Sequence, residues 1–235
     1  MYSAMSHTPP SFWQRLHSAH SQLTFSLGAS FYAWMTWQKT WRTHCADMAD
    51  HFQPQTAGQT LQVLDLGIGP GVSGISILDR RPDVRVVGLD FSSGMLRRAR
   101  HYLQLAGADI PLLRADVMQL PLCDASFDVL THHSFLYLLS DRERALSEMF
   151  RVLRPGGRYV ILEPNRAGRI WTVPRMRGGF RFKLSMFLWR LWSGGYGQFS
   201  RPELTQLLAR HGFVDISVTE TLDGLGLLAT ASRPR

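Results

Sequence analysis

Short apolar runs alternate with longer amphipathic stretches along most of the chain after residue 60. Runs rich in Val, Ile and Leu are typical of strands that are buried on both faces of a parallel sheet. The alternation of such strands with helical stretches predicts a doubly wound α/β fold with a mainly parallel sheet. Seven strands are expected, at 63–66, 84–89, 112–115, 127–131, 159–162, 213–221 and 225–231.

Residues 11–52 are expected to be helical, because Trp34, Trp37 and Trp41 recur at helical spacing. From Leu16 to Gln38 there is no Lys, Arg, Asp or Glu, and this stretch is long enough to span a bilayer. Ser, Thr, Gln and His fill much of it, however, and a spanning helix should be predominantly apolar. Two interpretations remain: a helix packed on the core of its own domain, or a lid over an active site that also touches a membrane.

The stretch Gln62–Gly74, which reads QVLDLGIGPGVSG, predicts a buried strand, a glycine-rich turn and a helix. Asp65 interrupts the strand, where a charge is costly without a partner. Gly67, Gly69 and Gly71 follow at alternate positions, and they let the backbone turn sharply and approach another molecule near the start of a helix. The dinucleotide pattern G-x-G-x-x-G fits only from Gly69 onward, which argues against a nicotinamide-dependent oxidoreductase. An ordinary glycine-rich turn is the alternative.

A second carboxylate, Asp90, ends the next apolar run. A carboxylate at the end of the strand after a glycine turn can accept hydrogen bonds from both ribose hydroxyls of an adenosine cofactor. The alternative is an aspartate that caps the following helix, although Ser92 or Ser93 is the better N-cap candidate. Asp116 follows the third strand in the same way, with a plain turn residue as its alternative.

The fourth strand delivers His132, His133 and Tyr137 to the carboxyl edge of the sheet, where open α/β sheets bind ligands. Neighbouring strand residues face opposite ways and no third ligand is evident, so no metal site is predicted. We expect His132 beside the cofactor and His133 facing the acceptor, or the reverse, with Tyr137 close by. Either histidine can serve as a general base, or simply pack in the core. Glu163, at the end of the fifth strand, is expected beside the acceptor.

Local signals predict several boundaries. Ser140 with Glu143, and Ser200 with Glu203, form capping-box patterns at the start of two helices. Arg154-Pro155-Gly156-Gly157 is expected to be a turn before the fifth strand. The glycine-rich run 193–197 is expected to act as a hinge.

The net charge of +8 comes from one region. Between Pro164 and Pro202 there are eight basic residues and no acid, whereas the other basic and acidic residues balance. The run Phe180–Trp192 is apolar, aromatic and cationic, which is typical of a helix at a membrane interface. The alternative is a helix that caps the substrate pocket of a soluble enzyme. Because the aromatic residues form one apolar run, the pattern argues against nucleic acid. The basic residues are Arg166, Arg169, Arg175, Arg177, Arg181, Lys183, Arg190 and Arg201.

Cys45 and Cys123 are too few for a disulfide framework or a cysteine-rich zinc site, and they suit a reducing compartment. The first residues lack a basic start followed by an apolar block, so no signal peptide is expected. We therefore expect a cytoplasmic protein, with a peripheral position on a membrane as the further hypothesis.

VLDLGIGPG closely resembles the first motif of the class I S-adenosylmethionine (SAM)-dependent methyltransferases. LRADVMQLPLCDASFDVL and LRPGGRYVILEPN also resemble that family, so the resemblance spans roughly 61–231. It implies a Rossmann-like seven-stranded fold, SAM as the cofactor and transfer of a methyl group to a nucleophile. It implies a ribose contact for Asp90 and an adenine contact for Asp116. The cofactor-binding residues it implies are Asp65, Gly67, Gly69, Gly71, Asp90 and Asp116, with Phe91, Met95 and Val117 packing around the adenosine.

The resemblance also favours a lid at residues 1–60, because N-terminal helices cover the cofactor in many relatives. Residues 61–235 would then be the SAM-binding domain, with the basic insertion at 165–199. The core resembles the branch that methylates quinone precursors, sterols and phospholipid amines, which suits a hydrophobic or lipid-like acceptor at a membrane surface. A soluble natural-product O- or N-methyltransferase is the alternative. A non-enzymatic membrane-binding module is the third, and the intact acids and glycines argue against it.

Overall fold

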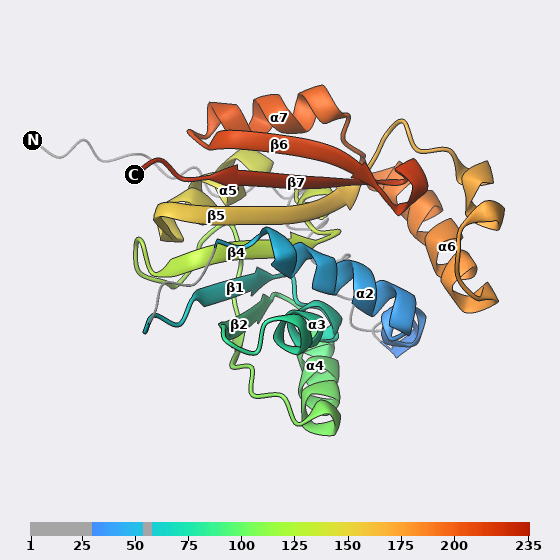
Figure 1. Ribbon diagram of the computed structural model, residues 1–235, viewed down its shortest axis with the longest axis horizontal. Helices are drawn as coiled ribbons and strands as arrows, with labels where there is room; N and C mark the ends of the chain where they lie inside the picture. The colour runs from blue at the N-terminus through green and yellow to red at the C-terminus, as the bar shows by residue number, and fades with distance from the viewer. Residues whose placement is uncertain (1–29, 54–57) are drawn as a thin grey trace, which may run out of the picture.

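Seven strands form one sheet in the order β3-β2-β1-β4-β5-β7-β6 (Figure 1), in a computed structural model that describes residues 30–53 and 58–235. The first five strands pair in parallel, and β7 runs antiparallel between β5 and β6. This arrangement confirms the predicted doubly wound fold. The strands are β1 (Gln62–Leu66), β2 (Arg85–Asp90), β3 (Leu112–Arg114), β4 (Phe127–His133), β5 (Leu153–Pro164), β6 (Val214–Thr221) and β7 (Gly226–Ser232).

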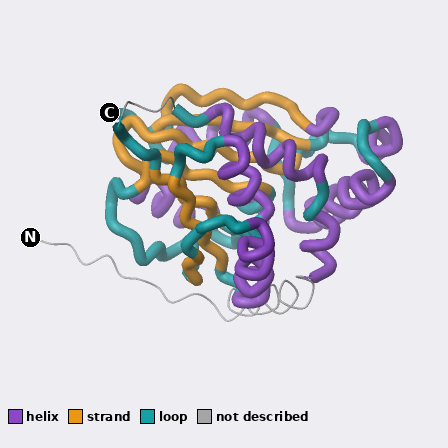
Figure 2. The backbone as a smooth tube through the Cα atoms, turned by 60° about the horizontal axis from the view of Figure 1, so that its bottom comes forward, coloured by secondary structure: helices purple, strands orange, loops and turns teal. Residues whose placement is uncertain are grey.

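Helices cover both faces of the sheet (Figures 1 and 2). The α-helices are α2 (Lys39–Asp47), α3 (Val72–Arg80), α4 (Ser93–Ala106), α5 (Arg142–Val152), α6 (Phe180–Tyr196) and α7 (Arg201–Arg210). Short 3-10 helices are η1 (Met48–His51), η2 (Leu136–Leu138), η3 (Ile170–Arg175) and η4 (Leu222–Gly224).

Strand alternation divides the core into two layers. Leu64 and Leu130 pack with residues of α5 and α7 on one face, whereas Val63 and Val129 pack with residues of α2, α3, α4 and α6 on the other. Because successive strand residues point to opposite faces, each residue's parity decides which layer it joins. The division into two layers determines which side chains at the ends of the strands face each layer.

The N-terminal helix is broken, which the tryptophan spacing did not predict. Residues 30–36 are helical, Gln38 is extended, and α2 begins at Lys39. The break lets Trp37 stack on Tyr102 of α4, with ring centroids 4.4 Å apart, while Trp41 is buried at 3% exposure. The tryptophans therefore do not form one helical face. Residues 1–29 and 54–57 of the predicted lid lie outside the described residues.

Three local predictions need correction. Asp141, not Ser140, caps α5, with its side chain accepting from the backbone N–H of Arg144 at 3.0 Å. The Arg154–Gly157 turn lies inside β5 as an irregularity, because the register to β4 shifts there and β5 is longer than predicted. The expected hinge at 193–197 is mostly helical, because α6 runs on to Tyr196. The predicted caps Ser92 and Ser200 are confirmed.

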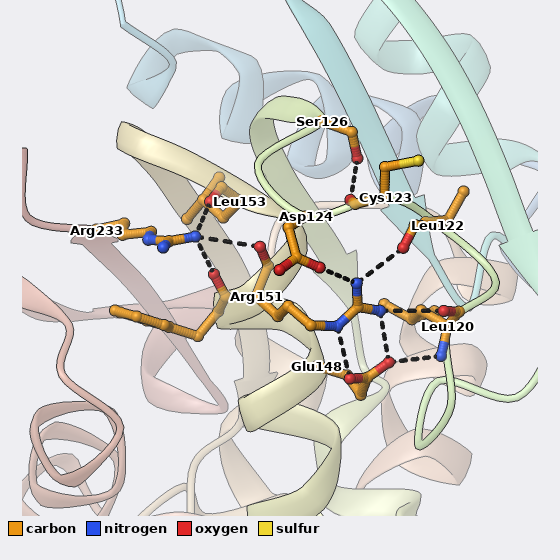
Figure 3. A network of polar contacts seen from close by, with 10 residues as sticks. Leu120, Leu122, Cys123, Asp124, Ser126, Glu148, Arg151, Leu153 and Arg233 are labelled. Atoms are coloured by element: carbon orange, nitrogen blue, oxygen red, sulfur yellow. Dashed lines mark hydrogen bonds and ion pairs between the residues drawn. The ribbon is translucent and has the colours of Figure 1, made fainter. Parts of the chain in front are cut away.

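An arginine network fastens the loop between β3 and β4 (Figure 3). The Arg151 guanidinium pairs with Glu148 at 2.8 Å and with Asp124 at 2.6 Å, and it donates to the backbone oxygens of Leu120 and Leu122. Glu148 also accepts from the N–H of Leu120 at 2.8 Å. The network therefore holds the loop that follows Asp116 against α5.

Candidate functional site

The glycine turn has the backbone that its sequence predicted. Gly67, Gly69 and Gly71 have φ of 65°, 55° and 90°, in the left-handed region that L side chains rarely adopt. A Cβ added at Gly67 would lie 2.3 Å from Cδ2 of Phe135, so that position also lacks room for a side chain. Gly71 is the N-cap of α3, which opens beside the turn.

Asp90 ties the end of β2 to the glycine turn. Its Oδ2 accepts from the N–H of Gly69 at 3.0 Å, and its Oδ1 accepts from the N–H of Ser92 at 2.8 Å. Asp116 lies at the end of the neighbouring strand, where its Oδ1 accepts from the N–H of Met118 at 2.9 Å. Both aspartates therefore hold local turns at the carboxyl edge, and each carboxylate oxygen has lone pairs for a further donor.

Asp65 is fully buried and only half satisfied. Its Oδ2 accepts from the Ser73 hydroxyl at 2.6 Å, whereas its Oδ1 has no hydrogen-bond partner. Burial raises the pKa of Asp65 to about 7. Asp65 does not line the cavity described below, but Ser73 does. Ser73 was not among the site residues predicted from the sequence, although its position in the first turn of α3 places it next to the glycines.

A cavity of about 410 Å³ opens at the carboxyl edge of the sheet. Its walls come from the glycine turn, Met95 of α4, the segment 133–138, residues 31–45 and α6. No Asp, Glu, Lys or Arg is among the residues that line it, in the part of the chain that the structure describes. The cavity therefore suits neutral, apolar chemistry next to the glycine turn. Of the predicted cofactor-binding residues, Gly67, Gly69 and Met95 line the cavity, whereas Gly71, Asp90, Phe91, Asp116 and Val117 do not.

The two histidines on β4 have different environments. His133 shares the parity of Val129, lines the cavity and contacts Trp41 edge-on at 5.0 Å between ring centroids. His132 shares the parity of Leu130 and is fully buried in the opposite layer. Its Nε2 lies 2.6 Å from the Tyr159 hydroxyl. The side chain of His132 therefore belongs to the core and does not reach the cavity.

Burial lowers the pKa of His133 to about 3, so its imidazole is neutral at pH 7. Its Nδ1 lies 3.0 Å from Ser134 Oγ, and its Nε2 has no hydrogen-bond partner. Tyr137, the other predicted catalytic residue, also lines the cavity, and burial holds the pKa of its phenol well above 10. Both side chains are therefore uncharged near neutral pH.

Glu163 does not lie beside the acceptor cavity, contrary to expectation. It is fully buried, and its carboxylate accepts from the backbone N–H groups of Phe135 and Leu136 at 2.9 Å and of Tyr137 at 3.1 Å. Three donors converge on this carboxylate because η2 begins there. Glu163 therefore shapes the segment that carries Tyr137.

The N-terminal segment and α6 meet across the cavity. The Trp41 indole N–H donates to Ser185 Oγ at 2.7 Å, and Arg181 donates to the backbone oxygen of Trp37. Arg181 also lies over the Trp34 ring. Figure 1 shows α6 beyond the tips of the parallel strands, on the side where the cavity opens. Both segments were expected from the sequence, but the contact between them was not. The lining residues it missed include Tyr32, Cys45, Ser185 and Trp189.

A mainly parallel seven-stranded sheet in this strand order, with a left-handed glycine turn opening a helix at its carboxyl edge, is the architecture of the SAM-dependent methyltransferases. A sequence model of the family described as "Methyltransferase domain" matches residues 63–157. The phosphoethanolamine N-methyltransferase 2 of Haemonchus contortus, solved with phosphomonomethylethanolamine and S-adenosylhomocysteine, has the same fold with a TM-score of 0.70. It is 16% identical, and the match covers 97% of this chain and 62% of that chain.

Curated relatives are more similar in sequence. A demethylmenaquinone methyltransferase of Thermus thermophilus is 35% identical over 161 residues, which cover 68% of this chain and 69% of the relative. A ubiquinone/menaquinone biosynthesis C-methyltransferase of Desulfotalea psychrophila is 31% identical over 165 residues, or 66% of each chain. The chain therefore belongs to the class I SAM-dependent methyltransferase family, in the branch that contains quinone methyltransferases. Its cofactor is SAM.

The residues present fit this cofactor. Gly67 and Gly69 line the cavity, and a Cβ added at Gly69 would meet no atom closer than 3.8 Å, so the backbone there is open to a bound molecule. Asp65, whose Oδ1 has no hydrogen-bond partner, lies behind this turn and reaches the cavity only through Ser73. When bound, SAM supplies a methyl group on a sulfonium that is already activated for transfer. The protein's task is therefore to hold two reactants in line and to exclude water.

Proposed function

We propose that this methyltransferase acts on a neutral, hydrophobic acceptor of the reduced quinone type, such as demethylmenaquinol, and takes it from an anionic membrane surface. The cavity is the main observation in favour of this class of acceptor. It is bordered by the glycine turn, and none of its described lining residues is an Asp, Glu, Lys or Arg. A phosphorylated acceptor would need cationic partners in such a site. The names of the curated relatives support the same class.

In this proposal, the cofactor is held by the glycine turn, by Asp65 acting through Ser73, and by Asp90. The adenosine of the cofactor is surrounded by Asp116, Val117, Phe91 and Met95. Residues 31–45 act as the lid over both reactants, because they line the cavity opposite the sheet.

His133 and Tyr137 face the acceptor as neutral hydrogen-bonding groups. A histidine with a pKa of about 3 is a weak base, so we assign His133 to positioning and not to proton abstraction.

The membrane part of the proposal rests on charge and exposure. Among the described residues, only Arg166 and Arg201 of the eight basic residues pair with an acid, namely Glu203 at 2.5 Å and Glu220 at 4.0 Å. The other six have no carboxylate partner there. Phe31, Leu191 and Trp192 line the cavity, yet they are 58%, 55% and 40% exposed, so they form an apolar rim at its mouth. An apolar rim, together with an insertion whose cations mostly have no carboxylate partner, fits an anionic bilayer.

No helix among residues 30–53 and 58–235 is long and apolar enough to cross a membrane. A soluble natural-product methyltransferase remains the alternative function. The apolar rim disfavours it, since a soluble acceptor needs no exposed rim.

The cofactor assignment is tested by calorimetric titration with S-adenosylhomocysteine. Asp90→Ala should weaken binding about 100-fold, because it removes charge-assisted acceptors and the contact to Gly69. Asp90→Asn keeps an acceptor oxygen, so its affinity for S-adenosylhomocysteine should fall only about tenfold. Asp109→Ala, at an exposed site before β3, is the control. Equal affinity for wild type and Asp90→Ala would contradict the assignment.

The acceptor is tested by methyl transfer to demethylmenaquinol in detergent micelles, with phosphoethanolamine as the comparison. We expect methylation of the quinol only. Transfer to phosphoethanolamine instead would overturn the acceptor class while leaving the cofactor result intact.

A further inference from the structure

Two side chains in the cavity wall carry a buried polar atom without a hydrogen-bond partner. These atoms are Nε1 of Trp189, on α6, and Nε2 of His133, at the end of β4. Trp41 lies between the two side chains, with its ring centroid 5.0 Å from that of His133 and 6.0 Å from that of Trp189. Both unpartnered atoms therefore belong to one aromatic cluster in the wall.

Trp41 provides the contrast within the same cluster. Its indole N–H is satisfied by Ser185 Oγ at 2.7 Å. A buried N–H without a partner is costly, and native proteins leave few of them. Trp189 is 8% exposed, so water does not readily supply the missing partner. In the wall of a binding cavity, the bound molecule can supply it.

The two atoms need different hydrogen-bonding partners. An indole N–H only donates, so Trp189 needs an acceptor such as a hydroxyl, ether or carbonyl oxygen. His133 is neutral, and when its Nδ1–H donates to Ser134 Oγ at 3.0 Å, its Nε2 is left to accept from a hydroxyl. Both atoms are covered in this structure, so each proposed contact requires the ring to turn about its side-chain bonds when a ligand binds.

We propose that Trp189 and His133 form an oxygen-recognition site in which Trp189 donates to one oxygen of a flat, neutral aromatic acceptor and His133 accepts from a hydroxyl of the same molecule. This inference rests on the proposed acceptor class and adds to it the two residues that orient the ring. Both are positioning residues: they fix which ring carbon faces the methyl donor.

The test measures binding of three neutral probes to protein saturated with S-adenosylhomocysteine, by calorimetry. 4-Methoxy-1-naphthol has a hydroxyl and an ether oxygen, 1,4-dimethoxynaphthalene has two ethers, and naphthalene has no oxygen. Trp189→Phe should weaken both oxygenated probes about fivefold and leave naphthalene within about twofold. His133→Phe should weaken only 4-methoxy-1-naphthol, by about fivefold, because the diether has no proton to donate.

Trp171→Phe is the matched control, since Trp171 is 62% exposed on η3 and does not line the cavity. It should leave all three affinities unchanged. Equal losses for all three probes in Trp189→Phe would overturn the proposal, because they would reveal packing alone. Failure of wild type to bind 4-methoxy-1-naphthol would overturn it as well. Because no probe needs to be methylated, a failure of quinol methylation would overturn the proposed acceptor and leave this site standing.

Discussion

Residue parity on the central strands separates structural from functional side chains. The sequence predicted that His132 and His133 face opposite ways, but not which of them meets the cavity. That choice follows from the layers, because Val129 packs toward α2 and α6 and Leu130 packs toward α5 and α7. The same rule places Asp65 toward Ser73 and α3. Parity can be read from sequence, but the identity of each layer depends on where distant helices dock.

Asp65 gives the first stability prediction. Its carboxyl loses its proton near pH 4 in the unfolded chain but only near pH 7 in the folded protein. Stability from this group is therefore fully present below pH 4 and is lost as the pH rises toward 7. The side chain of Asp65→Asn does not titrate. The free energy of unfolding of this variant minus that of wild type should therefore increase by roughly 3 kcal/mol from pH 5 to pH 8.

Urea unfolding at pH 5, 6, 7 and 8 measures this difference. Asp215→Asn, at an exposed position on β6, is the control and should run parallel to wild type. Parallel curves for Asp65→Asn and wild type would show that the carboxyl ionises at its ordinary pH in the folded protein.

At the scale of elements, strands and helices were largely predicted, whereas their supporting contacts were not. The five parallel strands, the glycine turn and the α7 capping box depend on local sequence, and each was found near its expected residues. Glu163 shows the limit: its three donors come from residues 26 to 28 positions earlier. Such a contact exists only once β4 and β5 have paired, so local pattern suggested a ligand-facing role instead.

Glu163→Gln should loosen the segment that carries Tyr137. A glutamine has one acceptor oxygen in place of two, and its amide donors would face backbone N–H groups. We expect a loss of about 2 kcal/mol in the free energy of unfolding and faster hydrogen exchange at residues 135–137. Glu220→Gln, on the surface of β6, should change neither. Unchanged exchange at these three amides would mean that η2 holds its shape without the carboxylate.

At the scale of the whole molecule, exposed aromatic side chains from two distant segments, Phe31 and Trp192, lie together in the cavity wall. The sequence located the basic insertion, but it did not show that the N-terminal segment packs against it. Trp41 and Ser185 are 144 positions apart, and neither carries a motif that points to the other. The docking of these two distant segments therefore could not be predicted from local sequence patterns.

This arrangement predicts binding to anionic vesicles in a flotation assay. The double change Arg175→Gln and Arg177→Gln removes two exposed cations of the insertion, and each should contribute about 1 kcal/mol to binding. We expect the partition coefficient to fall by more than about tenfold, and added salt to reduce the difference. Arg97→Gln with Arg100→Gln, at exposed positions of α4, is the control. Absence of wild-type protein from floated anionic vesicles would refute the membrane hypothesis.

The break at Gln38 has a further consequence for how the cavity opens. It separates α2, which has nine residues, from the helical residues that precede it, and an isolated helix of nine residues is marginal in water. These turns are stable because they are docked, through Trp41 on α6 and Trp37 on α4. The segment therefore cannot swing aside as a rigid flap: wherever it detaches, it uncoils. If this segment is the lid that we propose, admission of the acceptor is a local folding equilibrium, and a ligand that bridges the segment to the sheet also stabilises its helical turns.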